Sequence, residues 1–271
     1  MAETRPEEWR MRRVRRELDY LVWERDLGTS TDDIQHCPLG EDSQRGEGYT
    51  AERPSLVHPR NVRQDAIAVL TRAIEAHEPS IYGHPRRVAQ LAQAIGRALG
   101  WEEERIAAIE TGALLHDVGK IVISDAILKK PGPLTDEEYN EVKRHPEAGA
   151  QLLTAGGPSF EAAIPYALHH HEHYDGQGYP YGLAGEDIPI EGRILAVADA
   201  FEAMISDRPY RKRMEPELAL ELIERTAGSQ FDPKVVAAFL KAWKSGQIHV
   251  FLERKGPEKQ ALPLKLEDII V

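Results

Sequence analysis

The stretch that most constrains this chain is residues 113–120, with the sequence Ala-Leu-Leu-His-Asp-Val-Gly-Lys. An apolar helical run leads into it, in which Ile106 and Ile109 recur at the spacing of one helix face. If that face packs in the core, His116 and Asp117 lie close to the same buried stripe. Burial of an ionisable pair is costly unless a partner compensates it. A metal ion is the simplest partner, although a His-Asp dipeptide alone is more often not a metal site.

Composition limits the alternatives. The 271 residues suffice for one large domain or two small ones, and 41% hydrophobic residues can form a core. No apolar run approaches the roughly 20 residues of a membrane helix, and the N-terminus lacks the apolar stretch of a secretory signal. Cys37 is the only cysteine, so no internal disulfide can form. We therefore expect a cytoplasmic protein that does not enter a membrane.

The net charge of −11 argues against DNA as a partner. It does not argue against a small phosphorylated ligand, because a local pocket can be positive in an acidic protein.

Three regions are expected. Residues 1–60 combine a helix over 7–26 with an irregular linker rich in Gly, Ser, Asp and Pro. That helix has a short heptad-like seam, which fits either a homodimer contact or packing against its own domain. Residues 61–246 form the main domain, and residues 247–271 form an extension that could contain short strands.

The main domain is predicted to be all-α, because no alternation of strands and helices is visible. Thr135 and Glu138 have the spacing of a capping box, and Asp232 precedes a first-turn proline. The expected helices cover residues 62–77, 84–99, 102–117, 135–154, 159–172, 191–206, 215–227 and 233–245.

Several more histidines and one aspartate occupy core-facing positions. His84 begins an apolar helical stripe, and His145 is expected late in the helix opened by the capping box. His170 and His171 end an apolar helix, and Asp199 lies among apolar residues of another. A lone core histidine is usually a hydrogen-bonding residue, but several such groups together favour a metal centre.

The chain resembles the HD-GYP subgroup of the HD phosphohydrolase superfamily from about Ile74 to Leu240. The order and spacing of eight segments carry this resemblance: Gly83–Val88, His116–Lys120, Lys130–Thr135, His145–Pro146, His170–Glu172, Asp175–Pro180, Arg193–Asp199 and Asp207–Arg211.

The resemblance implies an HD-domain helical bundle that hydrolyses the bacterial second messenger cyclic di-GMP to linear pGpG, and often on to GMP. It implies two divalent metals, which together neutralise a phosphodiester and lower the pKa of a bound water. Iron or manganese suits a ligand set without thiolate, and zinc, nickel and cobalt remain alternatives for the metal. Asp117 would bridge the metals. His145, His170 and His171 would bind one metal, and His116, Asp199 and His84 would bind the other. The implied ligands are His84, His116, Asp117, His145, His170, His171 and Asp199.

The same resemblance suggests roles in substrate binding. Lys120 would meet a phosphate oxygen and stabilise charge in the transition state. Tyr179, in the Gly-Tyr-Pro loop, would stack on a guanine, and Arg208 and Arg211 would hold a phosphate or the guanine. The loop could also dock a diguanylate cyclase domain.

Departures from the family pattern refine these expectations. Some relatives carry a glutamate, a third-metal ligand, where this chain has Ser80. The nearby Glu78 lies half a helical turn from the position of that glutamate and cannot replace it as a ligand. We therefore expect two metals and not three. Glu202 stands where relatives often have aspartate, which keeps the charge. Two alternatives to the enzyme remain open: a weakly active nucleotide- or partner-binding module, and a phosphodiesterase for another cyclic dinucleotide such as cyclic GMP-AMP.

Overall fold

The computed structural model describes residues 59–78, 81–130, 132–207 and 212–248, and these are helical with no sheet. The predicted all-α class is confirmed. The helix expected over 7–26 and the strands expected after residue 248 lie outside the described residues. Among the described residues, no helix is both long and apolar enough to cross a membrane.

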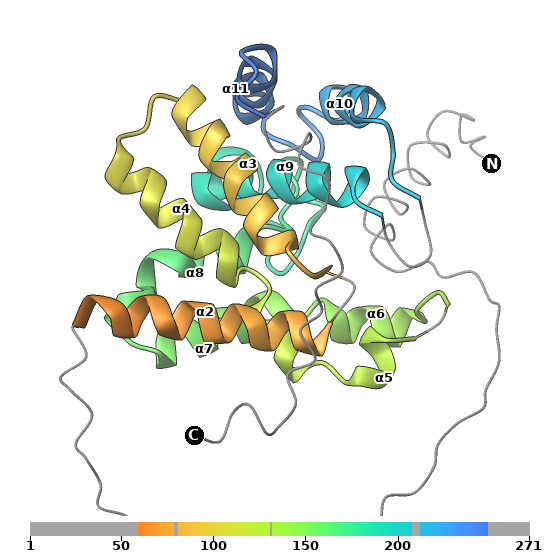
Figure 1. Cartoon of the computed structure of the whole chain (residues 1–271). Coiled ribbons are helices and arrows are strands. Elements are labelled where there is room, and N and C mark those ends of the chain that lie inside the picture. Colours follow the sequence, from red (N-terminus) through yellow and green to blue (C-terminus); the bar gives the residue numbers. More distant parts are fainter. Residues whose placement is uncertain (1–58, 79–80, 131, 208–211, 249–271) are drawn as a thin grey trace, which may run out of the picture.

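The helices follow one another along the chain with short connections (Figure 1). Three of the described elements are 3-10 helices, written η. The elements are α2 (Pro59–His77), α3 (His84–Ala98), α4 (Glu103–Leu115), η2 (Val118–Val122), α5 (Asp125–Leu128), α6 (Asp136–Val142), α7 (His145–Ala155), η3 (Pro158–Ala163), α8 (Ile164–His169), η4 (Gly185–Asp187), α9 (Ile190–Ile205), α10 (Pro216–Arg225) and α11 (Pro233–Lys244).

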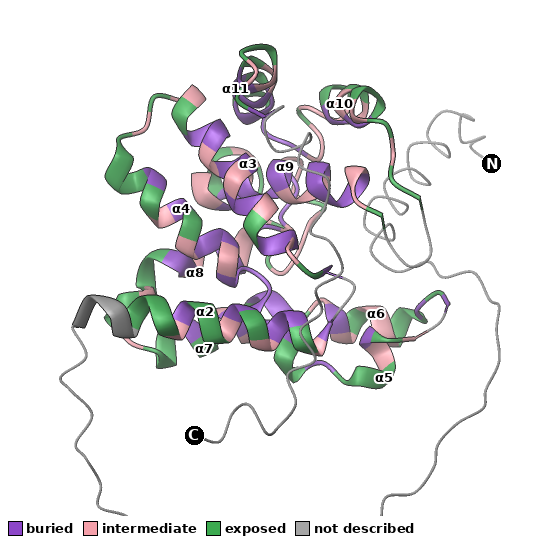
Figure 2. Cartoon of the chain, viewed as in Figure 1, coloured by how far each residue is buried: buried purple, intermediate pink, exposed green. Residues whose placement is uncertain are grey.

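Two large hydrophobic clusters organise these helices. One joins α3, α4, α9, α10 and α11 around residues such as Ile95, Phe201 and Phe239. The other joins α2, η2, α7 and α8 to the end of α4, around Ile74 and Leu115. Figure 2 shows buried faces turned inward on both groups of helices. Because α4 takes part in both clusters, its C-terminus lies where the two meet.

The predicted helix over 135–154 is wrong: the chain forms α6 and then α7. The capping box of Thr135 and Glu138 is confirmed at the start of α6. The break comes at Pro146, which has no backbone N–H and cannot continue a helix from the preceding turn. His145 therefore begins a helix instead of lying late in one. Likewise, the helix expected over 159–172 divides into η3 and α8.

A close backbone approach fixes η2 against α7. A Cβ atom added to Gly119 would lie 1.9 Å from the carbonyl oxygen of His145 and 2.4 Å from the backbone nitrogen of Gly149. Real atoms do not approach so closely, and backbone cannot move aside as a flexible side chain can. Glycine at residue 119 therefore lets the segment after His116 and Asp117 rest directly on the start of α7.

We predict that Gly119→Ala lowers the free energy of unfolding by at least about 3 kcal/mol, because overpacking would force two backbone segments apart. Gly100→Ala is the matched control: its φ is +82° but a Cβ there meets no atom within 4 Å. It should cost only about 1 kcal/mol from the left-handed backbone. Urea denaturation of both variants checks this, and equal losses would contradict the packing argument.

Candidate metal centre

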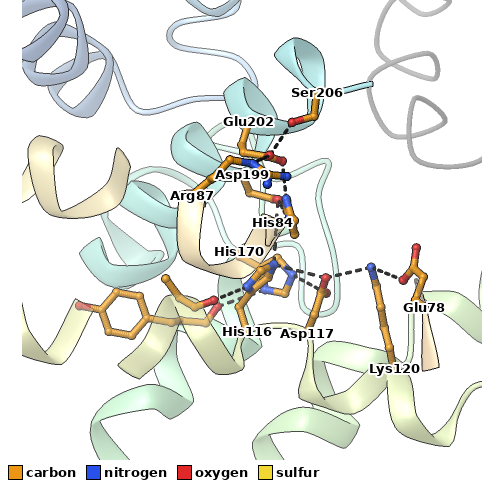
Figure 3. Close-up of polar contacts among 12 residues, drawn as sticks. Glu78, His84, Arg87, His116, Asp117, Lys120, His170, Asp199, Glu202 and Ser206 are labelled. Carbon is orange, nitrogen blue, oxygen red and sulfur yellow. Dashed lines mark hydrogen bonds and ion pairs between the residues drawn. The ribbon is translucent and has the colours of Figure 1, made fainter. Parts of the chain in front are cut away.

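The structure brings the predicted ligands together from five separate helix ends or faces. His84 begins α3, His116 and Asp117 follow α4, His145 begins α7, His170 and His171 follow α8, and Asp199 lies on α9. All are buried except His171 and Asp199, which are partly exposed. These side chains meet where the two hydrophobic clusters adjoin, so residues far apart in sequence form one polar centre (Figure 3).

The ligand atoms fall into two groups. His145, His170 and His171 form one, and His84, His116 and Asp117 form the other; within each, one atom per residue lies within 4.8 Å of the others. Asp199 joins the second group, with its Oδ1 3.1 Å from His84 Nε2 and 4.0 Å from His116 Nε2. This grouping agrees with the division of ligands expected from the sequence.

Asp117 lies between the two groups and faces both. Its Oδ1 is 3.3 Å from His145 Nε2 and 3.8 Å from His170 Nε2. Its Oδ2 is 3.3 Å from His116 Nε2. Each carboxylate oxygen thus faces a different set of histidines, which is the geometry that a bridging ligand requires.

Helix ends orient three of the histidines in the same way. Nδ1 of His116 donates to Ala113 O at 2.7 Å, Nδ1 of His145 to Val142 O at 2.7 Å, and Nδ1 of His170 to Ala167 O at 3.0 Å. Carbonyl groups in the last turn of a helix have no intrahelical partner. A hydrogen bond at Nδ1 leaves the Nε2 lone pair free for a metal and fixes the ring direction.

Pro146 contributes directly to this arrangement. In a continuous helix its backbone N–H would bond to the carbonyl of Val142, but proline has none. The Val142 carbonyl is therefore left to the imidazole of His145, three residues on.

His84 is oriented by a carboxylate instead of a carbonyl. Its Nδ1 is hydrogen-bonded to Glu202, whose other oxygen accepts from Arg87 Nε and Ser206 Oγ, each at 2.5 Å. Glu202 is 1% exposed, so its charge depends on protein partners such as these and not on water. The sequence analysis assigned Glu202 no site role, although its position three residues after Asp199 on α9 was a usable signal.

The pKa values of His145, His170 and Asp117 suit metal binding at neutral pH, whereas neighbouring carboxylates raise those of His84 and His116 despite their burial. Burial lowers the pKa of His145 to about 4 and, with the neighbouring His116 and His145, lowers that of His170 to about 3. Burial would raise the pKa of Asp117, but Lys120 and His116 hold it well below its usual range. These groups therefore present neutral nitrogens and an ionised carboxylate. Burial would lower the pKa of His84, but Glu202 and Asp199 raise it to about 9.

A divalent metal pair fits these residues. His116 Nε2 is buried and makes no hydrogen bond, although Asp117 Oδ2 lies 3.3 Å away. A buried nitrogen without such a bond is costly unless another partner takes its lone pair. The donor set is imidazole and carboxylate, which suits first-row divalent ions.

Lys120 is buried beside this centre. Its Nζ lies 2.9 Å from Asp117 Oδ2 and 3.4 Å from Glu78 Oε2 (Figure 3). Burial would lower the pKa of Lys120, but Asp117 and Glu78 raise it above its ordinary value, so the ammonium stays charged. The sequence analysis considered Glu78 only as a metal ligand and did not foresee this ion pair.

A pocket opens over the centre, and its wall includes Asp117, Lys120, His171, Tyr179 and Asp199. The Tyr179 ring stacks on His171, with ring centroids 4.7 Å apart and planes inclined by 19°. One face of Tyr179 is thus already occupied. Two of the predicted substrate contacts, Arg208 and Arg211, and also Ser80, lie outside the described residues.

Glu172 holds the Gly-Tyr-Pro loop in place. Its buried carboxylate accepts from the backbone nitrogens of Tyr181 at 2.8 Å and Leu183 at 3.1 Å. Gly178 lies so close to this segment that a Cβ would fall 2.2 Å from the backbone nitrogen of His173. The sequence analysis quoted both residues as motif members but gave Glu172 no role; its position between His171 and His173 could have indicated one.

Comparison with known proteins identifies the family. The HD domain family model matches residues 68–235, so the chain belongs to the HD domain family. The family assignment made from the motifs is therefore confirmed.

Relatives include the cyclic di-GMP phosphodiesterase response regulator RpfG of Xanthomonas campestris pv. campestris, 43% identical over 83% of this chain and 61% of its own length. A cyclic di-GMP phosphodiesterase of Thermotoga maritima is 41% identical over 66% of this chain and 49% of its own. The 3'3'-cGAMP-specific phosphodiesterase 2 of Vibrio cholerae is 36% identical over 72% of this chain and 38% of its own. The chain thus spans only part of each relative's length.

A solved structure shows the same fold. The cyclic GMP-AMP-specific phosphodiesterase V-cGAP3 of Vibrio cholerae superposes with a TM-score of 0.55 at 22% identity, covering 70% of this chain and 51% of that one.

We predict two bound metal ions per chain, and different losses from two substitutions. His145→Ala should remove about one ion, because it breaks only the three-histidine group, whereas Asp117→Ala should remove both, because Asp117 faces both groups. His169→Ala is the control, since His169 belongs to neither group. Elemental analysis of the purified variants measures the number of metal ions per chain. An equal loss of metal from His145→Ala and Asp117→Ala would contradict the bridging role.

Glu202→Gln should weaken metal binding about 10- to 100-fold, because it removes the charge that orients His84. Glu186→Gln, on an exposed ion pair with Lys234, should leave affinity unchanged. Competition with a chromophoric chelator measures the metal dissociation constant of each variant. An unchanged affinity in Glu202→Gln would show that packing alone orients His84.

Proposed function

We propose that this chain is a metal-dependent phosphodiesterase that hydrolyses cyclic di-GMP to linear pGpG, and further to GMP, in bacterial second-messenger signalling. The observation that carries the proposal is the convergence of two ligand groups on Asp117 beneath a pocket, in a chain of the HD domain family. Relatives at 43% and 41% identity bear the name cyclic di-GMP phosphodiesterase, which supports this substrate.

In this proposal the two metals, iron or manganese, would be held by His84, His116, Asp117, His145, His170, His171 and Asp199. Bound metals supply Lewis acidity and lower the pKa of a coordinated water. The chain's own groups do the rest. Lys120 presents a fixed positive charge at the pocket wall, suited to a phosphate oxygen that gains charge during reaction. Tyr179, backed by His171, offers an aromatic face to a base.

A second candidate substrate is 3'3'-cyclic GMP-AMP. Its support is specific: relatives at 36% identity are named 3'3'-cGAMP-specific phosphodiesterases. A third possibility is a module that binds the nucleotide or a partner with negligible turnover. The intact ligand set favours the enzyme, since a pseudo-enzyme usually loses one of its ligands.

The remaining expectations extend this function to partners and location. We propose a cytoplasmic protein in which the Gly-Tyr-Pro loop docks a diguanylate cyclase domain. A homodimer through the helix expected over 7–26 also stays a prediction, because that helix lies outside the described residues.

Metal-replete protein should be assayed in parallel on cyclic di-GMP, 3'3'-cyclic GMP-AMP and a generic phosphodiester, with products separated by chromatography. We expect cyclic di-GMP to give pGpG first and GMP later. Asp117→Ala should lose at least about 1000-fold in rate, because both metals depend on it. Parental activity in Asp117→Ala would overturn the mechanism, and binding of the dinucleotide without turnover in the parent would favour the binding module.

A further inference from the structure

Lys120 lines the pocket and lies beside a second carboxylate, that of Glu78. Glu78 lies on the side of Lys120 away from Asp117 and is not among the residues that line the pocket. Glu78 follows the last turn of α2, and Lys120 lies on η2, an element that packs against α2. Both side chains are buried, with exposures of 4% and 6%. Figure 3 shows the Lys120 ammonium between the carboxylates of Asp117 and Glu78. Glu78 is thus placed to act on the pocket through Lys120.

The two carboxylates cannot hold Lys120 equally well once metals are bound. Asp117 is the proposed bridge, so its negative charge would then be shared with two cations. Those cations would also repel the ammonium, and this repulsion is strong at short range in a buried site. Glu78 belongs to neither ligand group, so metals bound there would not share its charge, and its Oε2 lies 3.4 Å from Lys120 Nζ.

We propose that Glu78 is a positioning residue: it anchors the Lys120 ammonium at the pocket wall against the repulsion of the metal pair, in reach of the substrate phosphate. This inference rests on the proposed function. It assigns the end of α2 a role in the site that neither the metal-ligand set nor the Gly-Tyr-Pro loop includes. It also accounts for a buried carboxylate beside the centre that binds no metal.

The test separates charge from shape by comparing Glu78→Gln, which keeps the size, with Glu78→Asp, which keeps the charge. In metal-replete protein, Glu78→Gln should lower kcat for cyclic di-GMP about 10- to 100-fold with little change in KM or metal content. Glu78→Asp should retain more activity than Glu78→Gln. The control Glu191→Gln alters a carboxylate paired with Arg105 at 2.8 Å, away from the pocket, and should match the parent.

A double-variant cycle tests whether Glu78 acts through Lys120. Lys120→Met should lower kcat at least as much as Glu78→Gln, and the combined variant should be no slower than Lys120→Met alone. Any of three outcomes would overturn the proposal. The fold losses in kcat of the two single variants could multiply in the combined variant, Glu78→Gln could keep the parental kcat, or Glu78→Gln could be more active than Glu78→Asp.

The same cycle on metal-free protein gives a readout that does not depend on activity. The decreases in Tm for Glu78→Gln and Lys120→Met should add to more than the decrease in the combined variant, because each single change breaks the same contact between Glu78 and Lys120. Additive decreases would overturn the ion pair. If the parent protein does not hydrolyse cyclic di-GMP, the proposed function is wrong. If the parent and Glu78→Gln are equally active, only the role of Glu78 is wrong.

Discussion

The structure depends on the placement of one ionised carboxylate, Asp117, where two hydrophobic clusters meet. Its oxygens lie within 4 Å of three histidines and a lysine. An isolated carboxylate could not stay ionised in such a setting. Four buried or partly buried carboxylates lie here, namely Asp117, Asp199, Glu78 and Glu202, and a pair of divalent ions would compensate part of their charge.

The double core explains how the centre can be both buried and assembled from distant segments. α4 packs in the cluster with α3 and α9 along most of its length and enters the second cluster at Leu115. The next residues are His116 and Asp117. The chain then turns into η2, which Gly119 allows to rest on the first turn of α7. The apolar packing of each half thus sets the position of polar groups at their boundary, and neither half contains the full ligand set.

Much of this could be predicted from the sequence, and for identifiable reasons. Helical spacing placed Ile106 and Ile109 in the core, and both are buried. The order of the motifs picked out seven candidate ligands, and the structure brings their side chains together, most of them from helix ends. Glu78 and Glu202 were not assigned roles, because their partners Lys120 and His84 lie 42 and 118 residues away along the chain. The split into α6 and α7 was missed because the apolar spacing continues across Pro146, although that residue cannot continue the backbone ladder.

The histidines at helix ends serve two purposes at once. Helices commonly end with a glycine whose backbone satisfies the last carbonyls. Here the imidazoles of His116 and His170 satisfy carbonyls at the ends of α4 and α8 instead, and that of His145 satisfies one at the end of α6. The same bond that completes the helix end fixes the ring and aims its second nitrogen at the centre. A ligand set built this way needs no separate framework of polar residues to orient it, so an apolar core can surround it closely. Only His84, at the start of a helix where no free carbonyl is available, requires a buried carboxylate, and this is why Glu202 lies behind it.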